Sequence, residues 1–403
     1  MPNPLKNQTI LLGVTGSIAA YKAADLASKL HQAEAIVEVV LTNSALKFIT
    51  PLTFQSVTGR KAYTDADLWG GEGHVTHIGL GRAARLIVIA PASANTIAKL
   101  AHGIADNLLS VTVLASHCPL LIAPAMDAGM YDHPATTENI GILKNRGAHF
   151  VGPTAGHLAS GLVGVGRMSE PQEILNYARW ILSTGGPLSG KKIVVTAGGT
   201  QEPIDPVRLI TNRSSGKQGF ALAQAAADVG ADVVLISTVT HLPVPVGASL
   251  VKVCTAAEMH QAVLQEIQTA DILIMAAAVA DFRPAKQADQ KIKKDSGVTT
   301  IPLEPTIDIL QAVNEYRKKT GYPRKVIGFA AESQNLLENA TKKLQAKGLD
   351  LIIANDISAS DAGFEADTNR VTFLYPNGEQ KNLSKMAKSE VSEKVIEQVI
   401  EWC

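Results

Sequence analysis

The sequence predicts an α/β protein composed of two doubly wound domains. Short runs rich in Val, Ile and Leu recur along the chain, and each is followed by a turn of small residues and then by an alanine-rich helical segment. This alternation is found in both halves. Between the halves, residues 183–190 (STGGPLSG) form a dense cluster of Gly, Pro and Ser, so we place the domains at 1–187 and 188–403.

The individual elements follow from this pattern. In the first half we expect strands at 10–14, 36–41, 86–90 and 120–123, with helices that begin near Ser17, Ser93 and Ala135. In the second half we expect strands at 192–196, 232–236, 272–276, 326–329 and 351–354, with helices that begin near Ser215, Ala256 and Leu337. Each half starts with a strand that enters a glycine turn, but the residues beyond the two turns differ too much for an internal repeat.

The composition excludes several classes of function. The chain carries 37 Lys and Arg against 37 Asp and Glu, so its zero formal charge gives no reason to expect a nucleic acid or membrane partner. Its three cysteines are far apart, without a CxxC motif, which argues against a disulfide framework and a zinc site. No stretch reaches the roughly 18 apolar residues of a spanning helix. We therefore expect a cytoplasmic protein.

The residues that follow the strands of the first half suggest a nucleotide site, because ligands of such sheets lie beyond the carboxyl ends of the strands. Gly16 permits a turn, and Ser17 can cap the next helix while the free amides face a phosphate. Ser44 offers a second hydroxyl, residues 90–95 (APASAN) suit a flat heterocycle, and Asp106 can reach its edge. A capped helix without ligand explains the first turn equally well, since GxGxxG is absent.

Other loops of the first half carry groups for catalysis. His77 follows a glycine-rich loop and is our candidate base, with His74 as a rival and a packed surface histidine as the alternative. Met126–Asp127 follows the strand at 120–123. Residues 159–167 contain enough glycine for a flap in which Arg167 pins a carboxylate or phosphate, although a merely flexible connection explains them equally well.

The second half predicts a site for a nucleoside triphosphate. Asn212–Lys217 (NRSSGK) opens a helix and forms an anion cradle that does not match the Walker pattern. Asp281 ends a strand, and Lys291–Lys294 (KIKK) follows. Basic runs are usually solvated surface. A carboxylate able to hold Mg²⁺ and a basic loop beside an anion cradle nevertheless favour triphosphate chemistry.

These motifs resemble the bifunctional phosphopantothenoylcysteine decarboxylase/phosphopantothenate–cysteine ligase family of coenzyme A biosynthesis, over essentially the whole chain. The first half carries GSIAAYK, FITPLTFQSVTG, APASAN and PAMDAGMY, similar to flavin-containing cysteine decarboxylases. The second carries TAGGTQEPIDPVRLITNRSSGKQG, AAAVADFRP, KIKK, GFAAE and LIIAND, similar to the ligase. The resemblance implies a flavodoxin-like flavoprotein domain followed by a Rossmann-like ligase domain.

The same resemblance implies two reactions. The C-terminal domain would activate 4'-phosphopantothenate with CTP and Mg²⁺ as an acyl-cytidylate, which the amine of cysteine then attacks. The N-terminal domain would use FMN to decarboxylate 4'-phosphopantothenoylcysteine to 4'-phosphopantetheine. It also implies a homo-oligomer, with trimeric flavin domains and dimeric ligase domains.

Site residues carry over position by position. By resemblance the catalytic residues are His77, Ser160 and Asn212. The expected FMN-binding residues are Gly16, Ser17, Ser44, Pro91, Ala92, Ser93, Asn95 and Asp106, and the expected substrate-binding residues are Met126, Asp127 and Arg167. The expected CTP-binding residues are Ala277, Asp281, Lys291, Thr306, Ile307, Asp308, Ile309, Phe329, Lys343 and Lys347, with Asp281 also a ligand of Mg²⁺.

Two positions depart from the family pattern. Asp127 replaces the usual asparagine and would repel a substrate carboxylate unless it is protonated or a cation intervenes. Ser160 replaces the cysteine that donates a proton, and a hydroxyl is a far weaker acid than a thiol. A third, minor departure is Ile307 in place of proline. We therefore keep three hypotheses: a working bifunctional enzyme in which water or a nearby residue is the donor, a ligase whose flavin half stalls or acts on something else, and a flavin domain that serves only for oligomerisation or regulation.

Overall fold

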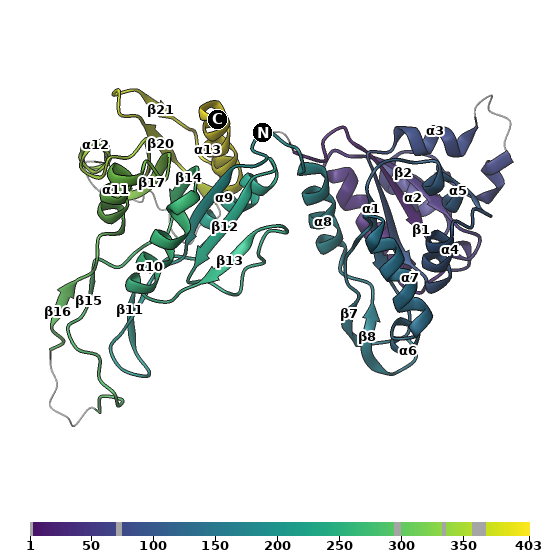
Figure 1. Ribbon diagram of the computed structural model, residues 1–403, viewed down its shortest axis with the longest axis horizontal. Coiled ribbons are helices and arrows are strands. Elements are labelled where there is room, and N and C mark those ends of the chain that lie inside the picture. The colour runs from purple at the N-terminus through teal and green to yellow at the C-terminus, as the bar shows by residue number, and fades with distance from the viewer. Residues whose placement is uncertain (1–2, 70–74, 294–299, 333–335, 357–367) are drawn as a thin grey trace. The chain divides into compact units, whose positions relative to one another are not determined.

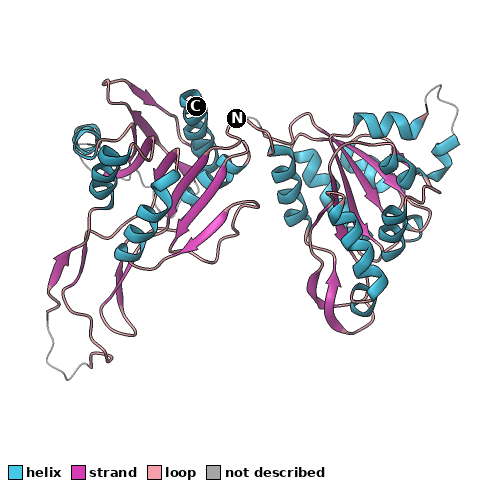
Figure 2. Cartoon of the chain, in the orientation of Figure 1, coloured by secondary structure: helices cyan, strands magenta, loops and turns pink. Residues whose placement is uncertain are grey.

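The computed structural model describes residues 3–69, 75–293, 300–332, 336–356 and 368–403. The chain folds into two compact units that divide between Ser183 and Thr184, within the Gly/Pro/Ser-rich segment. Both units are α/β, with helices on the two faces of a sheet (Figures 1 and 2). No helix among the described residues has the length and apolar character to span a membrane.

The N-terminal unit contains a parallel six-stranded sheet in the order β3-β2-β1-β4-β5-β6. Its strands are β1 (Thr9–Val14), β2 (Ile36–Leu41), β3 (Ala62–Tyr63), β4 (Leu86–Ala92), β5 (Leu120–Pro124) and β6 (His149–Phe150). Without the short edge strand β3, the order is that of flavodoxin-like sheets, with the topological switch point between β1 and β4. The predicted doubly wound fold is confirmed.

Helices cover both faces of this sheet, and a hairpin follows β6. The helices are α1 (Ala20–Gln32), α2 (Pro51–Thr58), α3 (Thr76–Ala83), α4 (Ala94–His102), α5 (Leu108–Leu114), α6 (Ala128–Tyr131), α7 (Pro134–Asn145) and α8 (Pro171–Ser183), with single turns η1 (Ala45–Lys47) and η2 (Asp65–Trp69). The hairpin consists of β7 (Thr154–His157) and β8 (Val163–Arg167).

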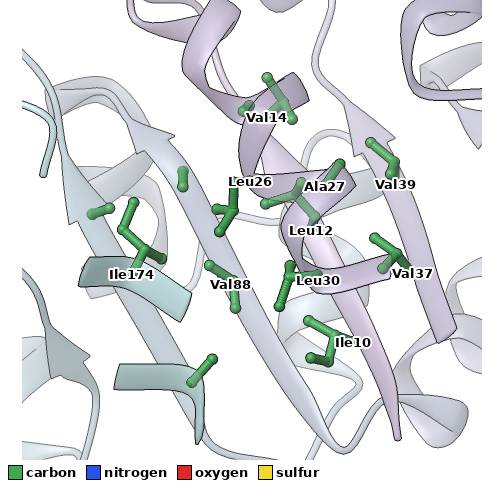
Figure 3. Packing of buried hydrophobic residues seen from close by; sticks show 14 of the residues in the cluster. Ile10, Leu12, Val14, Leu26, Ala27, Leu30, Val37, Val39, Val88 and Ile174 are labelled. Carbon is green, nitrogen blue, oxygen red and sulfur yellow. The ribbon is translucent and has the colours of Figure 1, made fainter. Parts of the chain in front are cut away.

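The apolar runs are continuous because both faces of the sheet are buried. Along β1, Leu12 packs in one core cluster and Leu11 in the other. Figure 3 shows Leu12 beside Leu26 and Leu30 of α1. Alternate residues of one strand therefore serve different cores, which fixes the register of the sheet.

The C-terminal unit contains an eight-stranded sheet in the order β13-β12-β9-β14-β17-β18-β20-β21. Its strands are β9 (Lys192–Ala197), β12 (Asp232–Ser237), β13 (Ser249–Lys252), β14 (Ile272–Met275), β17 (Lys325–Glu332), β18 (Leu351–Asp356), β20 (Val371–Leu374) and β21 (Gln380–Asn382). The strands from β13 to β18 are parallel and follow the Rossmann order, with the switch point between β9 and β14. At the other edge, β20 pairs antiparallel with β18, and β21 pairs antiparallel with β20.

Helices and small hairpins complete this unit. The helices are α9 (Lys217–Ala227), α10 (Ala256–Glu266), α11 (Ile309–Thr320), α12 (Leu336–Lys347) and α13 (Lys388–Trp402), with the turn η3 (Ile267–Thr269). The paired short strands are β10 (Gln201–Pro203) with β11 (Leu209–Thr211), β15 (Phe282–Pro284) with β16 (Leu303–Pro305), and β19 (Thr368–Asn369) with β22 (Met386–Ala387). In Figure 1, β15 and β16 extend beyond the end of the sheet.

One local expectation was wrong. Helix α1 begins at Ala20, and its N-cap is Ala19, not Ser17. The Ser17 hydroxyl instead accepts a hydrogen bond from the Ala19 amide at 3.3 Å, within the turn that precedes the helix. Ser17 therefore shapes the approach to the helix without capping it.

Candidate active sites

The carboxyl ends of β1, β2 and β4 meet at the switch point of the N-terminal sheet. The Thr15 hydroxyl donates to the Pro91 carbonyl at 2.7 Å and accepts from the Ser93 amide at 3.0 Å, which ties the ends of β1 and β4 together. A Cβ on Gly16 would lie 2.5 Å from the Cβ of Ser44, so only glycine lets these two turns approach. Gly16, Ser44 and Ser93 are thus brought to one edge of the sheet.

The remaining predicted FMN residues lie along the same edge. Pro91 and Ala92 are the buried last residues of β4, and Ser93 caps α4 by accepting from the Thr96 amide at 3.3 Å. Asn95 is exposed in the first turn of α4. Asp106 forms a 2.7 Å ion pair with Lys99. Small hydroxyl side chains, a helix start and a rigid proline turn suit the phosphate and ring of a flavin mononucleotide.

A cavity of about 380 Å³ lies between the start of α1, the segment after β5 and the β7–β8 hairpin. It gathers the predicted substrate residues with two residues from other predicted groups: Ser17, Met126, Asp127, Ser160 and Arg167. Three further lining residues, Tyr21, Lys22 and His157, were not among the predicted site residues, although Tyr21 and Lys22 belong to the GSIAAYK motif.

Glycines of β8 allow the hairpin to pack closely against the segment after β5. The Met126 amide donates to the Gly166 carbonyl at 3.0 Å, and a Cβ on Gly166 would collide with the Met126 carbonyl. A Cβ on Gly164 would lie 2.7 Å from the Cβ of Ala128. Gly164 and Gly166, two of the glycines that suggested a flexible flap, therefore allow the hairpin to contact the segment after β5 closely.

Asp127 and Ser160 contact each other in this cavity. The Ser160 hydroxyl donates to Asp127 Oδ2 at 2.6 Å, and the Gly129 amide donates to Oδ1 at 3.0 Å. These two hydrogen bonds lower the pKa of Asp127 below its ordinary value, and burial opposes them only weakly. Asp127 is therefore a carboxylate at neutral pH, and the option of a protonated Asp127 is removed.

Cationic groups offset this negative charge. Arg167 lies 3.7 Å from Glu170, and Lys22 forms a 2.7 Å ion pair with the same glutamate. Lys22 also donates to the Met168 carbonyl at 3.3 Å and is buried. Arg167 and Lys22 both line the cavity with Asp127, so a substrate carboxylate would meet two positive groups there.

His77 lies away from this cavity within the chain. It is on α3, half-buried, and it is not among the residues that line this cavity. Its Nδ1 is enclosed and has no hydrogen-bond partner among the described residues. That His77 lies over the nucleotide site of the first half stays a prediction, and His74 lies outside the described residues.

The C-terminal unit contains a larger cavity, of about 530 Å³, at its own switch point. Threonines fix the loop after β14, which forms its floor. The Thr196 hydroxyl accepts from the amides of Ala276 and Ala277, each at 3.1 Å, and the Thr200 hydroxyl accepts from the Ala280 amide at 2.9 Å. These bonds hold the loop in position beneath any ligand.

Asn212 is anchored against the same loop. Its Nδ2 donates to the carbonyls of Val279 at 3.1 Å and Ala278 at 3.4 Å. Ser214, Ser215 and Gly216 follow at the start of α9 and also line the cavity. Gly216 has a φ of 76°, a conformation that favours glycine, and it precedes the first helical residue. The predicted anion cradle therefore opens into this cavity.

Two lysines of α12 face the start of α11. Lys347 forms an ion pair with Asp308, which caps α11 by accepting from the Gln311 amide at 2.9 Å. Burial acts to raise the pKa of Asp308, but Lys347, the Gln311 amide and the charge of Lys343 outweigh it, so the pKa is lowered. Both lysines line the cavity.

The cavity collects most of the predicted CTP residues. Those that line it with Asn212 are Ala277, Asp281, Thr306, Ile307, Asp308, Ile309, Phe329, Lys343 and Lys347. Lys291 is exposed and is not among them, and Lys294 of the same basic run lies outside the described residues. Among the described residues, no cluster of three or more His, Cys, Asp or Glu side chains is arranged so that it could hold a metal ion such as Mg²⁺. A single carboxylate such as Asp281 fits a magnesium ion that is held mainly by substrate phosphates and water.

Sequence reasoning missed two asparagines of this cavity. Asn355 and Asn369 are 9% and 3% exposed, and the Oδ1 of each has no partner among the described residues. Asn369 Nδ2 donates to Gln218 at 2.9 Å, which orients its amide. Asn355 lies near the carboxyl end of β18, in the LIIAND motif and directly after the predicted strand 351–354, and this position was the available signal.

Comparison with known proteins identifies the family. The family model "Flavoprotein" matches residues 1–182, and the model "DNA/pantothenate metabolism flavoprotein C-terminal domain" matches residues 188–402. The chain is 47% identical over 398 residues to the coenzyme A biosynthesis bifunctional protein CoaBC of Bacillus subtilis (strain 168), covering 98% of this chain and 97% of that protein. The chain belongs to the CoaBC family.

Other CoaBC relatives agree. The CoaBC protein of Mycobacterium tuberculosis (strain ATCC 25618 / H37Rv) is 42% identical over 403 residues, covering 97% of this chain and 96% of that protein. Among solved structures, the C-terminal domain of a CoaBC protein is 40% identical, with a TM-score of 0.46, and covers 54% of this chain and 97% of that chain. A PPC decarboxylase mutant in complex with pantothenoylaminoethenethiol is 39% identical, with a TM-score of 0.40. The match covers 43% of this chain and 97% of that chain.

Membership in the CoaBC family fixes the general function. The chain is a bifunctional enzyme of coenzyme A biosynthesis, with a flavoprotein decarboxylase half and a phosphopantothenate–cysteine ligase half. A ligase that carries a repurposed or non-catalytic flavin domain is not favoured.

Proposed function

We propose that the C-terminal domain uses CTP and Mg²⁺ to join cysteine to 4'-phosphopantothenate. The observation that carries this proposal is that Asn212, Asp281 and the lysine pair of α12 line one cavity. The N-terminal domain then converts the product, 4'-phosphopantothenoylcysteine, to 4'-phosphopantetheine with FMN as its cofactor. Both steps belong to the cytoplasm, where the thiols of substrate and product stay reduced.

The ligase reaction proceeds in two displacements. A carboxylate oxygen of 4'-phosphopantothenate attacks the α-phosphorus of CTP and pyrophosphate leaves, while Lys343 and Lys347 offset the negative charge. Asp281 would hold the Mg²⁺ ion, which would supply further charge neutralisation when bound. The amine of cysteine then attacks the acyl carbon, an amide bond forms, and CMP leaves. Asn212, held by two backbone carbonyls, positions the acyl group for this second step.

The decarboxylase reaction uses the edge of the N-terminal sheet and the hairpin cavity. Gly16, Ser17 and Ser44 would hold the phosphate of FMN, and residues 90–95 would contact its ring. When bound, FMN supplies the reversible two-electron oxidation of the cysteinyl side chain that makes loss of CO₂ feasible. Arg167 holds the substrate carboxylate, and Met126 packs beside it.

Two predicted residues act between copies of the chain in this proposal. His77 is outside the cavity of its own chain but has an enclosed, unpartnered Nδ1 among the described residues. Lys291 is exposed on the segment between β15 and β16. We assign His77 to the flavin site of a neighbouring copy in a trimer, and Lys291 to the CTP site of a dimer partner.

The test is analysis of products by mass. Purified protein is incubated with 4'-phosphopantothenate, cysteine, CTP and MgCl₂, with ATP in place of CTP and EDTA in place of MgCl₂ as controls. Saturated phosphopantetheine supports the proposal. A product two hydrogens lighter means that the flavin half stalls, and an unchanged cysteinyl adduct means that this half is not catalytic. Product formation that persists in EDTA contradicts the role of Mg²⁺.

A further inference from the structure

The decarboxylase half requires a proton donor. Loss of CO₂ replaces a C–CO₂⁻ bond with a C–H bond, so each turnover takes up one proton at carbon. The electrons balance within the site, because the two that FMN accepts return to the product. Within one chain, the groups that line the hairpin cavity are the available donors, and this inference rests on the proposed decarboxylation.

The hydroxyl and carboxylate of the cavity do not suit this task. The proton of Ser160 is already directed at Asp127, and a serine hydroxyl is a very weak acid. Asp127 is ionised, and each of its oxygens accepts a hydrogen bond. The two residues therefore hold each other and leave no acidic proton for the substrate.

The cationic and phenolic groups are unsuitable as well. Arg167 does not release a proton in proteins. Lys22 is buried, and its ammonium group is held by Glu170 at 2.7 Å and by the Met168 carbonyl at 3.3 Å. Tyr21 is 65% exposed, and a phenol is a weak acid. None of these groups offers the substrate an acidic proton.

His157 is the remaining titratable group of the cavity lining. It is the last residue of β7, pairs with Val163 of β8, and lies in the same hairpin as Ser160. Its side chain is exposed, and no hydrogen bond or ion pair engages its ring in the described part of the chain. An imidazole has an ordinary pKa of about 6.5 and exchanges protons near neutral pH.

We propose that His157 is the catalytic proton donor of the flavoprotein half. After CO₂ has left, the imidazolium N–H gives its proton to one carbon of the unsaturated intermediate while the two returning electrons arrive as a hydride at the other, and the neutral imidazole regains a proton from solvent on its exposed side. Lys22, Arg167, Asp127 and Glu170 are the charged groups around this exchange, and their charges offset one another. His157 thereby replaces the donor that Ser160 cannot provide.

The test compares three variants of the full-length, FMN-loaded protein supplied with 4'-phosphopantothenoylcysteine. His157→Gln should release CO₂ at nearly the normal rate but form saturated product about 100-fold more slowly, with the product two hydrogens lighter accumulating. Ser160→Cys in the His157→Gln background should restore saturated product, which also shows that the variant folds. His102→Gln, an exposed histidine on α4, is the matched control and should behave as the unmodified protein.

A second readout does not depend on turnover. In the holoenzyme with labelled histidine, the ring resonances absent from His157→Gln should shift when phosphopantetheine is added. Unshifted resonances, or saturated product at the normal rate from His157→Gln, overturn the inference while leaving the decarboxylation intact. Absence of CO₂ release from the unmodified protein would instead refute the proposed function, and the inference with it.

Discussion

The hydroxyl of Ser160 donates a hydrogen bond to the carboxylate of Asp127 over 2.6 Å, between residues 33 positions apart. These are the two positions at which the chain departs most from the motifs of the family that it resembles, and the fold places them in contact. A carboxylate needs a donor, which a hydroxyl supplies well. The two departures are therefore coupled through one hydrogen bond.

This coupling predicts a non-additive pair of substitutions. Ser160→Cys should speed formation of saturated product, because a thiol is a better acid than a hydroxyl. The charge of Asp127 would raise the pKa of that thiol. The double variant Asp127→Asn, Ser160→Cys should therefore form saturated product faster than the combined effects of the two single substitutions predict. Single-turnover product analysis of the four proteins checks this. Equal rates for the single and double variants would show that the contact has no catalytic effect.

Asn212→Asp should cause the acyl-cytidylate to accumulate. A carboxylate cannot donate to the carbonyls of Val279 and Ala278, so the anchored position of the side chain is lost, and its negative charge repels the phosphates. Quenched-flow samples analysed by mass spectrometry measure the intermediate. Asn145→Asp at the end of α7 is the control. Normal turnover of Asn212→Asp would remove this residue from the mechanism.

Asp205 should position the segment that carries Lys291. Its buried carboxylate accepts from the Ile292 amide at 3.1 Å and from the Arg208 guanidinium at 2.6 Å, and Arg208 also donates to the Ile292 carbonyl at 2.6 Å. Asp205→Asn should raise the KM for CTP with a smaller change in kcat, while Asp289→Asn in the same segment should not. An unchanged KM for CTP would show that the contacts of Asp205 with Ile292 and Arg208 do not contribute to CTP binding.

The same substitution should change the pH dependence of stability. Burial acts to raise the pKa of Asp205, but the amides of Val207, Ile292 and Arg208 and the Arg208 side chain lower it far below its ordinary value. A lowered pKa contributes stability above the unfolded value near 4, and that contribution is lost as the pH falls toward the folded pKa. The difference in Tm between the unmodified protein and Asp205→Asn should therefore shrink on acidification below about pH 4. A constant difference would contradict the ionised carboxylate.

Gly166→Ala should impair the decarboxylase and leave the ligase intact. The added Cβ would collide with the Met126 carbonyl and displace β8 from the segment that follows β5. A displacement of this kind at a reacting centre costs on the order of 100-fold in rate. Gly141→Ala in α7, where a Cβ would meet open space, is the control. Separate assays of CO₂ and pyrophosphate release distinguish the two halves, and equal losses in both would indicate general unfolding.

The parallel strands could be predicted because they are buried on both faces. Segment 351–354 reads as an unbroken apolar run and 36–41 as one interrupted only by Glu38, and the predicted strands agree closely with β18 and β2. The antiparallel strands β20 and β21 were not predicted, since β21 is short and fully exposed and leaves no apolar signal. Helix α13 packs against α9 but was not predicted, because it does not follow an apolar strand and a turn of small residues, the pattern on which the helix predictions relied.

The candidate sites could be predicted only where motifs follow strands. Asn212 and Asp281 lie on such loops and enter one cavity. His157 was missed because it is at the end of a hairpin strand, and only the fold brings it to the cavity that Asp127 also lines. His77 and Lys291 have motifs but do not line either cavity described above, and their assignment to neighbouring copies stays a proposal.

The two switch points described above each sit over a separate set of buried residues, none of which draws members from the other half of the chain. Each interior is thus assembled from one half of the chain alone. We therefore expect residues 1–187 and 188–403, each expressed from a gene segment of its own, to fold without the other.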